Sequence, residues 1–403
     1  MENPVFKYKK VPYSLDIVYP NKYYGGVYNL GMLIIYNIVN KRENWNCNRV
    51  FLDKNKISSE LVGFTLQYEP DLKNILEMKK QCNGITFAGG PVINANPEKF
   101  KKHFDFLLLG EAEESLNLIL DEYEKDKENF LKNIKNIKGI NTYNITEELG
   151  DYPLIQPFPE EINQDFVFGK PFILETERGC PFTCKFCILP NLYKKVRYRM
   201  NWKEIIDEGL KINKRNRVVI YSPSFTHPEK KQILQYLKTK GVRVTIPSIK
   251  VELMDKELLQ LIKDVGQESL TIAPECNETL RKTLGKLATD NIYFKFIQLC
   301  NEIKIKKLKV YLIIGLPNQT EQDIIETREF IDKLNKEFNG KLYLSINYFV
   351  PKPRSLFENH EFNKAELKKQ KKIAEREFKH YKIKITGLSS SALEYKISKT
   401  GSL

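Results

Sequence analysis

Short apolar runs alternate with stretches of helical periodicity along the first third of the chain. Residues 30–39 and 71–82 place their apolar side chains at the spacing of a helix. Residues 50–53 and 61–65 are short, mostly apolar runs, which are typical of short buried strands. This alternation predicts a doubly wound α/β domain over residues 1–125.

Two stretches of this domain, residues 84–91 and 104–114, each run from an apolar strand into a glycine turn. Doubly wound sheets bind ligands beyond the carboxyl ends of their strands, where glycine lets the backbone approach a ligand closely. The residues of the two turns are therefore candidates for a ligand-binding edge: Gly89, Gly90, Pro91, Gly110 and Glu111. Glycines that merely make tight turns would give the same pattern.

The pattern changes after residue 125. Residues 126–168 read as a charged helix followed by a proline-rich, aperiodic stretch, which predicts a linker. Residues 356–403 are expected to form a carboxyl-terminal helix at 364–381, a strand at 381–386 and a short tail. Between them, strands and helices alternate over residues 169–355, which predicts a partial (β/α)6 barrel with strands at 172–176, 218–221, 242–247, 269–273, 309–315 and 342–349.

Polar residues and one glycine follow the predicted barrel strands. Barrels of this class carry their sites at the carboxyl ends of the strands, so these residues become candidates for a binding site. A polar residue at a strand end is also often just a solvated cap, and each assignment keeps that alternative. The candidates are Ser222, Ser224, Ser248, Lys250, Glu275 and Gly315.

Cys180, Cys184 and Cys187 stand close together, with three and then two residues between them. Three thiolates from one loop suit an iron-sulfur cluster and leave one iron of a cubane without a protein ligand. A structural zinc site needs four ligands, and the only histidine in the following fifty residues is His227. A disulfide network is a poor interpretation, because the other cysteines are scattered: Cys47, Cys82, Cys276 and Cys300.

The motif Cys-x-x-x-Cys-x-x-Cys, preceded by a strand and by Arg178-Gly179, resembles that of the radical S-adenosylmethionine (SAM) superfamily. The resemblance implies a [4Fe-4S] cluster whose open iron binds the amino and carboxylate groups of SAM. An electron from the cluster then releases a 5'-deoxyadenosyl radical. Phe186 matches the aromatic residue that packs beside the adenine in this family, although a plain hydrophobic role is an alternative.

Other stretches of the predicted barrel resemble cobalamin-type (class B) radical SAM proteins. Residues 245–250 and 271–286 match the third and fourth strand ends of those proteins, which brings Ser248, Lys250 and Glu275 into the implied SAM site. In the family, the glutamate commonly contacts the ribose hydroxyls. Residues 315–321 match the turn that lies against the adenine. Cys276 could face the substrate, but a small buried filler is the favoured interpretation.

The first domain resembles the Rossmann-like cobalamin-binding domain that precedes many radical SAM enzymes. It lacks the motif Asp-x-His-x-x-Gly, so no histidine is offered as the lower cobalt ligand, and His103 has the wrong neighbours for that role. If cobalamin binds, the resemblance implies that Gln67 and Tyr68 lie under the corrin. Both are otherwise ordinary loop residues.

Composition adds little to this picture. The net charge of +14 would suit a nucleic-acid or acidic protein partner, but the lysines are spread along helices beside glutamates instead of forming one patch. No apolar run is long enough to span a membrane, and no basic apolar leader opens the chain. We therefore expect a cytoplasmic protein without a membrane partner.

Together these features predict a cobalamin-dependent radical SAM methyltransferase that methylates an unactivated carbon. The resemblance favours a protein or peptide substrate, for example a glutamine of methyl-coenzyme M reductase, and a low-potential electron donor such as ferredoxin or flavodoxin. One alternative is a methylthiotransferase acting on transfer RNA, whose family carries three more cysteines in the first domain. Another is a non-catalytic cobalamin or iron-sulfur sensor, which would have no use for an open iron.

Overall fold

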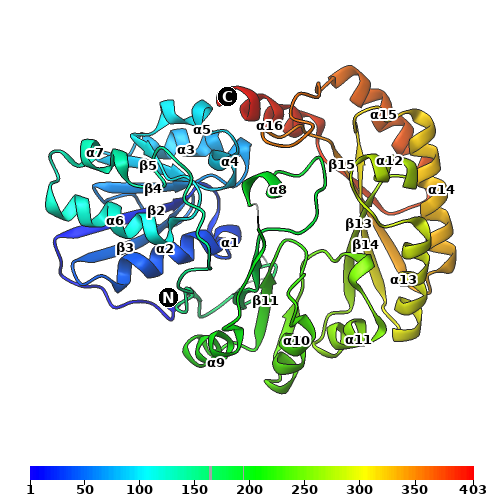
Figure 1. The fold of residues 1–403 in the computed structure, drawn as a ribbon, viewed down its shortest axis with the longest axis horizontal. Coiled ribbons are helices and arrows are strands. Elements are labelled where there is room, and N and C mark those ends of the chain that lie inside the picture. Colours follow the sequence, from blue (N-terminus) through cyan, green and yellow to red (C-terminus); the bar gives the residue numbers. More distant parts are fainter. Residues whose placement is uncertain (163–165, 194) are drawn as a thin grey trace. The chain divides into compact units, whose positions relative to one another are not determined.

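The computed structural model describes residues 1–162, 166–193 and 195–403, which separate into two compact units (Figure 1). Unit 1 comprises Met1–Ile173, Glu204–Arg215 and Lys396–Leu403, and unit 2 comprises Leu174–Lys203 and Asn216–Tyr395. No helix within the described ranges is both long and apolar enough to cross a membrane.

Unit 1 is built on a five-stranded parallel sheet with the strand order β3-β2-β4-β5-β6. The chain moves outward from β2 first to one side and then to the other, which is the order of a flavodoxin-like doubly wound fold. The predicted α/β fold of the amino-terminal region is therefore confirmed. The strands are β2 (Tyr13–Tyr19), β3 (Trp45–Phe51), β4 (Leu61–Thr65), β5 (Ile85–Gly89) and β6 (Phe106–Leu107).

Helices cover this sheet. α2 packs beside α6 on one face, and the right-handed crossovers after β4 and β5 place α3 and α4 on the other (Figure 1). Burial of Leu33, Val39 and Leu116 against the sheet supplies apolar core. The helices are α1 (Tyr23–Gly26), α2 (Leu30–Lys41), α3 (Leu72–Lys79), α4 (Pro91–Ala95), α5 (Pro97–Phe100), α6 (Ala112–Lys125) and α7 (Phe130–Asn133).

Residues 126–162 have the composition of a linker but pack into unit 1. Phe130 and Tyr152 are buried there, and the backbone N–H of Asn144 donates to the carbonyl of Leu109 at 3.0 Å. A short strand, β7 (Phe158–Pro159), pairs antiparallel with β1 (Glu2–Asn3). The charged helix expected at the start of this stretch is reduced to the single turn of α7.

Unit 2 carries the predicted barrel strands in two sheets, with the orders β8-β11-β12 and β13-β14-β15-β16. The backbone N–H of Ile249 donates to the carbonyl of Thr271 at 2.9 Å, which joins the two sheets beyond the end of β12. The barrel prediction is thus confirmed, with β16 as an additional parallel strand beside β15. The strands are β8 (Phe172–Glu175), β11 (Arg217–Tyr221), β12 (Arg243–Thr245), β13 (Ser269–Glu275), β14 (Lys307–Ile314), β15 (Lys341–Tyr348) and β16 (Ile383–Ile385).

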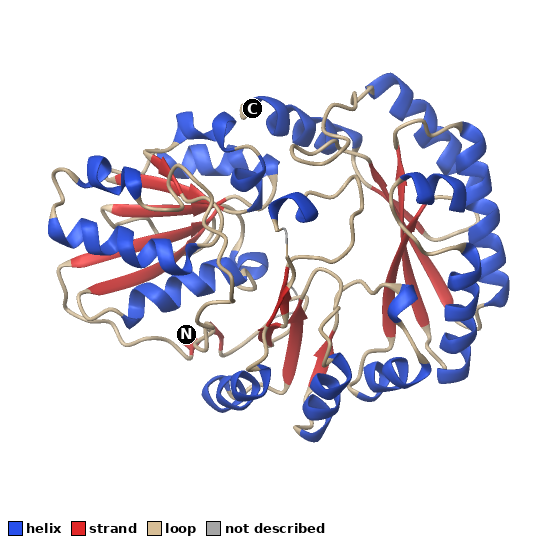
Figure 2. Cartoon of the chain, in the orientation of Figure 1, coloured by secondary structure: helices blue, strands red, loops and turns tan. Residues whose placement is uncertain are grey.

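Helices line the outer side of the β13–β15 sheet and leave its other side turned toward β11 (Figure 2). This matches the strand burial, since Leu308, Val310 and Leu312 of β14 are buried under the helices while the alternate residues are partly exposed. The helices of the second half are α8 (Leu189–Leu192), α9 (Trp202–Asn213), α10 (Lys230–Thr239), α11 (Lys256–Asp264), α12 (Glu278–Thr283), α13 (Asp290–Ile303), α14 (Glu321–Glu337), α15 (Lys364–Glu377) and α16 (Leu388–Thr400).

The prediction of a short tail from residue 387 is wrong, because residues 388–400 form α16. Its serine-rich start has the composition of a loop, but Ser391, Ala392 and Ile397 are buried, so packing overrides the local signal.

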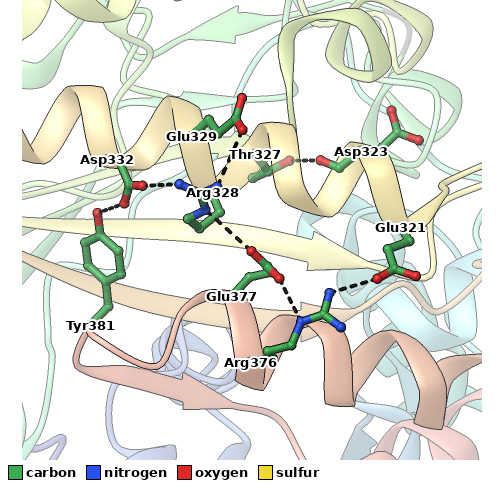
Figure 3. A network of polar contacts seen from close by, with 9 residues as sticks. All are labelled: Glu321, Asp323, Thr327, Arg328, Glu329, Asp332, Arg376, Glu377 and Tyr381. Carbon is green, nitrogen blue, oxygen red and sulfur yellow. Dashed lines mark hydrogen bonds and ion pairs between the residues drawn. The ribbon is translucent and has the colours of Figure 1, made fainter.

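Polar contacts tie α14 to α15 on the outer layer (Figure 3). Arg328 on α14 pairs with Asp332 and with Glu377 of α15, and Arg376 of α15 pairs with Glu321 of α14 at 2.8 Å. These side chains are partly exposed, so each pair adds little to stability. The network is a feature of the outer surface of unit 2.

Candidate functional site

Three cysteines lie on a loop that begins just after the first barrel strand. The loop follows β9 (Glu177–Arg178), turns at Gly179 with φ = +92°, and carries Cys180, Cys184 and Cys187 as free, partly exposed thiols. A Cβ on Gly179 would lie 2.8 Å from the carbonyl oxygen of Lys195, so only glycine fits this turn.

The base of this cysteine loop is held closed by backbone pairing and by a buried carboxylate. β9 pairs antiparallel with β10 (Arg197–Tyr198). Glu175 accepts hydrogen bonds from Arg178 Nε at 2.9 Å and from Arg199 Nη2 at 2.9 Å. Burial alone would raise the pKa of Glu175, but the two guanidinium groups lower it below its ordinary value. The ionised carboxylate therefore joins both ends of the loop.

Polar side chains from the next strands reach the thiols. Ser224 Oγ lies 3.4 Å from Cys180 Sγ, and Lys250 Nζ lies 3.9 Å from Cys184 Sγ. The same ammonium group sits 4.2 Å from the ring centroid of Phe182. Burial, followed by the neighbouring thiols, raises the pKa of Cys187. Two of the candidates predicted at strand ends, Ser224 and Lys250, are thus brought to the cysteine loop.

The donor set fits a cluster better than a single ion. Within the described ranges, no three Cys, His, Asp or Glu side chains are grouped as a mononuclear metal site requires. A cubane presents separate irons at separate corners, so its thiolate ligands need not converge on one point. The spacing of Cys180, Cys184 and Cys187 on one loop is therefore suited to hold an iron-sulfur cluster.

Glu275 ends β13 in an unusual conformation. The strand register shifts between Ile272 and Glu275, and Glu275 has φ = +68°, in the left-handed region. Its carboxylate forms an ion pair with Lys286 Nζ at 2.8 Å, and both side chains are only 9% exposed. Lys286 also donates to the carbonyl of Ala273. The bulge therefore presents a buried, paired carboxylate at the strand end.

Arg281 holds the backbone of this bulge through hydrogen bonds to its carbonyl groups. Its fully buried guanidinium donates to the carbonyls of Pro274 at 3.2 Å and Cys276 at 3.0 Å, on either side of Glu275. It also donates to the carbonyl of Ala288 at 2.8 Å and pairs with Asp290 at 3.1 Å. Arginine suits this role because it offers five donors in a rigid fork.

The cysteine loop lies against the turn that follows α12. Lys185 N donates to the carbonyl of Leu284 at 2.9 Å, and a Cβ on Gly285 would lie 3.0 Å from the carbonyl oxygen of Thr183. Lys286 Nζ lies 5.9 Å from the ring centroid of Phe186. The contacts place Glu275 and Lys286 next to the cysteine loop, and the role of Glu275 as a SAM ligand stays a prediction.

Phe186 packs on an apolar cluster that includes Leu316 and Phe349. Gly315, with φ = +85°, approaches α15 so closely that a Cβ would lie 2.3 Å from Leu367 Cδ2. Cys276 is buried in the same cluster, and burial raises its pKa to about 12. Its burial agrees with the role of a small core residue, whereas the role of Phe186 beside an adenine stays a prediction.

Two serines differ in what surrounds them. Ser222 Oγ accepts a hydrogen bond from Phe225 N at 2.8 Å, so it stabilises the turn after β11. Ser248 is partly exposed after β12, where its role as a SAM ligand stays a prediction.

In unit 1 the predicted glycine turns lie at the carboxyl edge of the sheet, but two of the glycines serve the protein's own turns. Gly90 has φ = +111°, and a Cβ there would lie 2.7 Å from the carbonyl oxygen of Leu66. Gly110 has φ = +87°, and a Cβ there would lie 2.1 Å from the carbonyl oxygen of Asn144. This favours the alternative that these glycines make tight turns. Gly89 and Pro91 lie at the same edge.

The remaining candidates of unit 1 divide into exposed loop residues and residues that contact other parts of the protein. Gln67 and Tyr68 follow β4 and are exposed, as a ligand-facing loop requires. Glu111 is buried and accepts a hydrogen bond from Thr146 Oγ1 at 2.7 Å, so it has a structural role. His103 Nε2 lies 2.7 Å from the carbonyl oxygen of Gly401.

Sequence reasoning missed Lys286, Arg281 and Phe182, which complete the surroundings of Glu275 and the cysteines. Lys286 and Arg281 lie in the matched stretch 271–286, but only the fold shows that they reach the bulge. A cavity of about 710 Å³ lies elsewhere, at the amino end of β15 between α14 and α15. Barrel enzymes place their chemistry at the carboxyl ends, where the cysteine loop lies.

Residues 174–331 match the sequence profile of the radical SAM superfamily, and residues 57–142 match that of the amino-terminal region of radical SAM proteins. The chain belongs to the radical SAM superfamily. An uncharacterized protein of Methanocaldococcus jannaschii is 31% identical to this radical SAM protein over 374 residues, covering 89% of this chain and 82% of that one. A proposed methylthiotransferase of the same organism is 25% identical over 337 residues, covering 76% and 72%.

A solved structure shares the fold of this radical SAM protein. It is the radical SAM methyltransferase TsrM from Kitasatospora setae, determined with cobalamin and a [4Fe-4S] cluster bound. The match has a TM-score of 0.62 at 15% identity and covers 83% of this chain and 74% of TsrM. The cofactors of the superfamily, SAM and a [4Fe-4S] cluster, agree with the cysteine loop described above.

Proposed function

We propose that this radical SAM protein is a cobalamin-dependent methyltransferase that methylates an unactivated carbon. The observation that carries the proposal is a complete cysteine loop within an architecture that matches the cobalamin-bound methyltransferase TsrM over 83% of the chain. When bound, the cluster and SAM supply a radical that removes hydrogen from carbon, and cobalamin supplies the methyl group.

The residues of unit 2 would bind and orient these groups. Cys180, Cys184 and Cys187 hold the cluster, and Lys250 places a positive charge beside Cys184. Glu275 offers a carboxylate for the ribose hydroxyls of SAM, oriented by Lys286. Four further residues would complete the SAM site. They are Phe186 on the cysteine loop and three residues that follow barrel strands, Ser224, Ser248 and Gly315.

Cobalamin would bind at the carboxyl edge of the unit 1 sheet, where doubly wound folds bind their ligands. Gln67 and Tyr68 are exposed on this edge and would face the corrin. His103 contacts the carbonyl of Gly401, which supports binding without a histidine ligand to cobalt.

For the substrate we propose a protein side chain, of which the glutamine of methyl-coenzyme M reductase is an example. Ferredoxin or flavodoxin would supply the electron, and the net charge of +14 supports association with such an acidic partner. A nucleic-acid substrate is the weaker proposal.

A methylthiotransferase is the second candidate, because a relative proposed to have that activity is 25% identical. The methylthiotransferase family carries three additional cysteines in its first domain, which hold an auxiliary cluster. Residues 1–173 contain only Cys47 and Cys82, and Cys47 is buried in β3. The cysteine content therefore favours simple methyl transfer.

The test is the mass added to the substrate. The protein is expressed beside methyl-coenzyme M reductase and, separately, with bulk transfer RNA, and both are analysed by mass spectrometry. A methyl group on a reductase peptide is expected. A methylthio group on RNA with unchanged reductase peptides would favour the second candidate, whereas failure to form 5'-deoxyadenosine would indicate a non-catalytic sensor.

A further inference from the structure

One barrel strand, β14, carries a lysine on the face that is turned away from the helices. Along β14, Leu308, Val310 and Leu312 are buried, while Lys309 and Tyr311 alternate with them and are partly exposed. Successive side chains of a strand point to opposite faces of the sheet. Lys309 and Tyr311 therefore face the inner side of the barrel sheet, which the helices leave uncovered (Figure 2).

The two side chains contact each other. Lys309 Nζ donates to Tyr311 Oη at 2.9 Å and lies 4.7 Å from the centroid of the tyrosine ring. Because the phenol oxygen accepts this bond, its own proton remains available to a further acceptor, and the ammonium group has two more N–H donors. The pair thus offers hydrogen-bond donors without offering a strong acceptor.

No carboxylate of the described residues forms an ion pair with Lys309. The register places Thr271 and Tyr343 beside Lys309, and Ser345 beside Tyr311, so the neighbours on this face bear hydroxyl groups. A partly buried lysine on the inner side of a barrel sheet, without a carboxylate partner, is a candidate for binding a ligand. The chemistry that would satisfy it is an anion.

The position of the pair favours a small anionic group over a nucleic-acid backbone. Tyr311 lies three residues and Lys309 five residues before the end of β14, or about 10 Å and about 17 Å below the carboxyl edge of the sheet at ~3.3 Å per residue. Nucleic-acid phosphates are bound by several exposed Lys and Arg residues, whereas one ammonium and one phenol inside a barrel suit a single carboxylate.

We propose that Lys309 and Tyr311 bind a carboxylate group of the substrate. The inference rests on the proposed function in one respect, that the substrate enters the barrel from the edge that carries the cysteine loop. It then specifies the substrate class: a peptide with an acidic side chain or a terminal carboxylate some way from the carbon that reacts.

The test measures protection of Lys309 in the anaerobically isolated holoprotein, without turnover. The protein is treated with an amine-acylating reagent, and the modification rates of Lys309 and Lys307 are followed by mass spectrometry. Glutarate is added as the carboxylate probe, glutaramide as its uncharged isostere and inorganic phosphate as the competing anion. We expect glutarate to slow the acylation of Lys309 several-fold and to leave the exposed Lys307 unchanged, with glutaramide inactive.

Two variants separate the loss of carboxylate binding from a general effect of substitution on the fold. Tyr311→Phe retains the ring but removes the phenol proton, so glutarate protection of Lys309 should weaken. Lys307→Met, two residues away on the same strand, should leave the protection intact. Equal protection by glutaramide, protection by phosphate alone, or no protection would overturn the proposal. Because no methylation is measured, these outcomes leave the proposed function to be judged by its own product assay.

Discussion

At the scale of single residues, the cysteines of the loop differ from the buried cysteines in their exposure to solvent. The cysteines are free thiols on one loop, whereas Cys47, Cys276 and Cys300 are buried in unit cores. Burial raises the pKa of Cys300 to about 12, so it is a poor metal ligand and a poor nucleophile. Exposure and position on the loop therefore separate the functional thiols from the structural ones.

Replacing Cys180, Cys184 or Cys187 with Ala should abolish formation of 5'-deoxyadenosine, because two thiolates cannot hold a cubane in place. Cys82→Ala is the matched control, since Cys82 is also partly exposed but lies in unit 1. The measurement is bound iron together with 5'-deoxyadenosine after anaerobic reconstitution. Normal turnover by a Cys184→Ala protein with quantified iron would refute the cluster assignment.

A second residue-scale prediction concerns the buried pair of Glu275 and Lys286. Glu275→Gln removes a charged acceptor worth about 1.5–3 kcal/mol per hydrogen bond, so the dissociation constant of SAM should rise about tenfold to a hundredfold. Lys286→Met should weaken SAM binding as well, because it releases the carboxylate from its fixed position.

The control for this pair is Lys282→Met. Lys282 stands on α12 four residues earlier, is 61% exposed and pairs with Glu278, so SAM affinity should not change. Affinities are measured by calorimetry on protein that carries the reconstituted cluster. If Glu275→Gln bound SAM as tightly as the parent protein, Glu275 would not be a SAM ligand.

At the scale of elements, the sequence pattern predicts most barrel strands but not the irregular geometry that forms the site. The bulge at Glu275 depends on Arg281, whose partners Pro274, Cys276 and Ala288 are backbone carbonyls that no sequence motif reveals. The strand β2 is missed for a related reason. Its apolar run is interrupted by Asp16, which is buried and accepts hydrogen bonds from the N–H groups of Ser58 and Ser59 at 2.6 and 2.8 Å and from Asn48 Nδ2 at 3.0 Å.

Arg281→Met should destabilise unit 2 by about 3–5 kcal/mol, the usual cost of removing one partner from a buried ionic network. Three carbonyls would lose their donor, and Asp290 would lose its cation. Arg376→Met is the matched control, since Arg376 is 57% exposed in the surface network of Figure 3. Its unfolding midpoint in urea, followed by circular dichroism, should match that of the parent protein. Equal midpoints for both variants would contradict the role given to Arg281.

At the scale of the whole molecule, alternation of strands and helices was sufficient to predict two α/β regions, because each region buries its own apolar faces. The alternation did not predict how the segments outside these strands and helices pack. Residues 126–162 have the composition of a linker yet contribute Phe130 and Tyr152 to the core of unit 1, and α16 forms from a serine-rich stretch. Such segments are ordered by contacts with distant parts of the chain, which local pattern does not contain.

The electronic state of cobalt tests the architecture as a whole. Residues 1–173 contain a single histidine, His103, and its Nε2 lies 2.7 Å from the carbonyl oxygen of Gly401. We therefore expect no histidine as the lower ligand: the full chain loaded with cobinamide, which lacks the base of cobalamin, should give a cobalt(II) electron paramagnetic resonance spectrum without nitrogen superhyperfine splitting. His103→Ala should show the same spectrum and the same corrin content. Splitting that is present in the parent protein and lost in His103→Ala would identify His103 as the ligand and overturn the proposed cobalamin site.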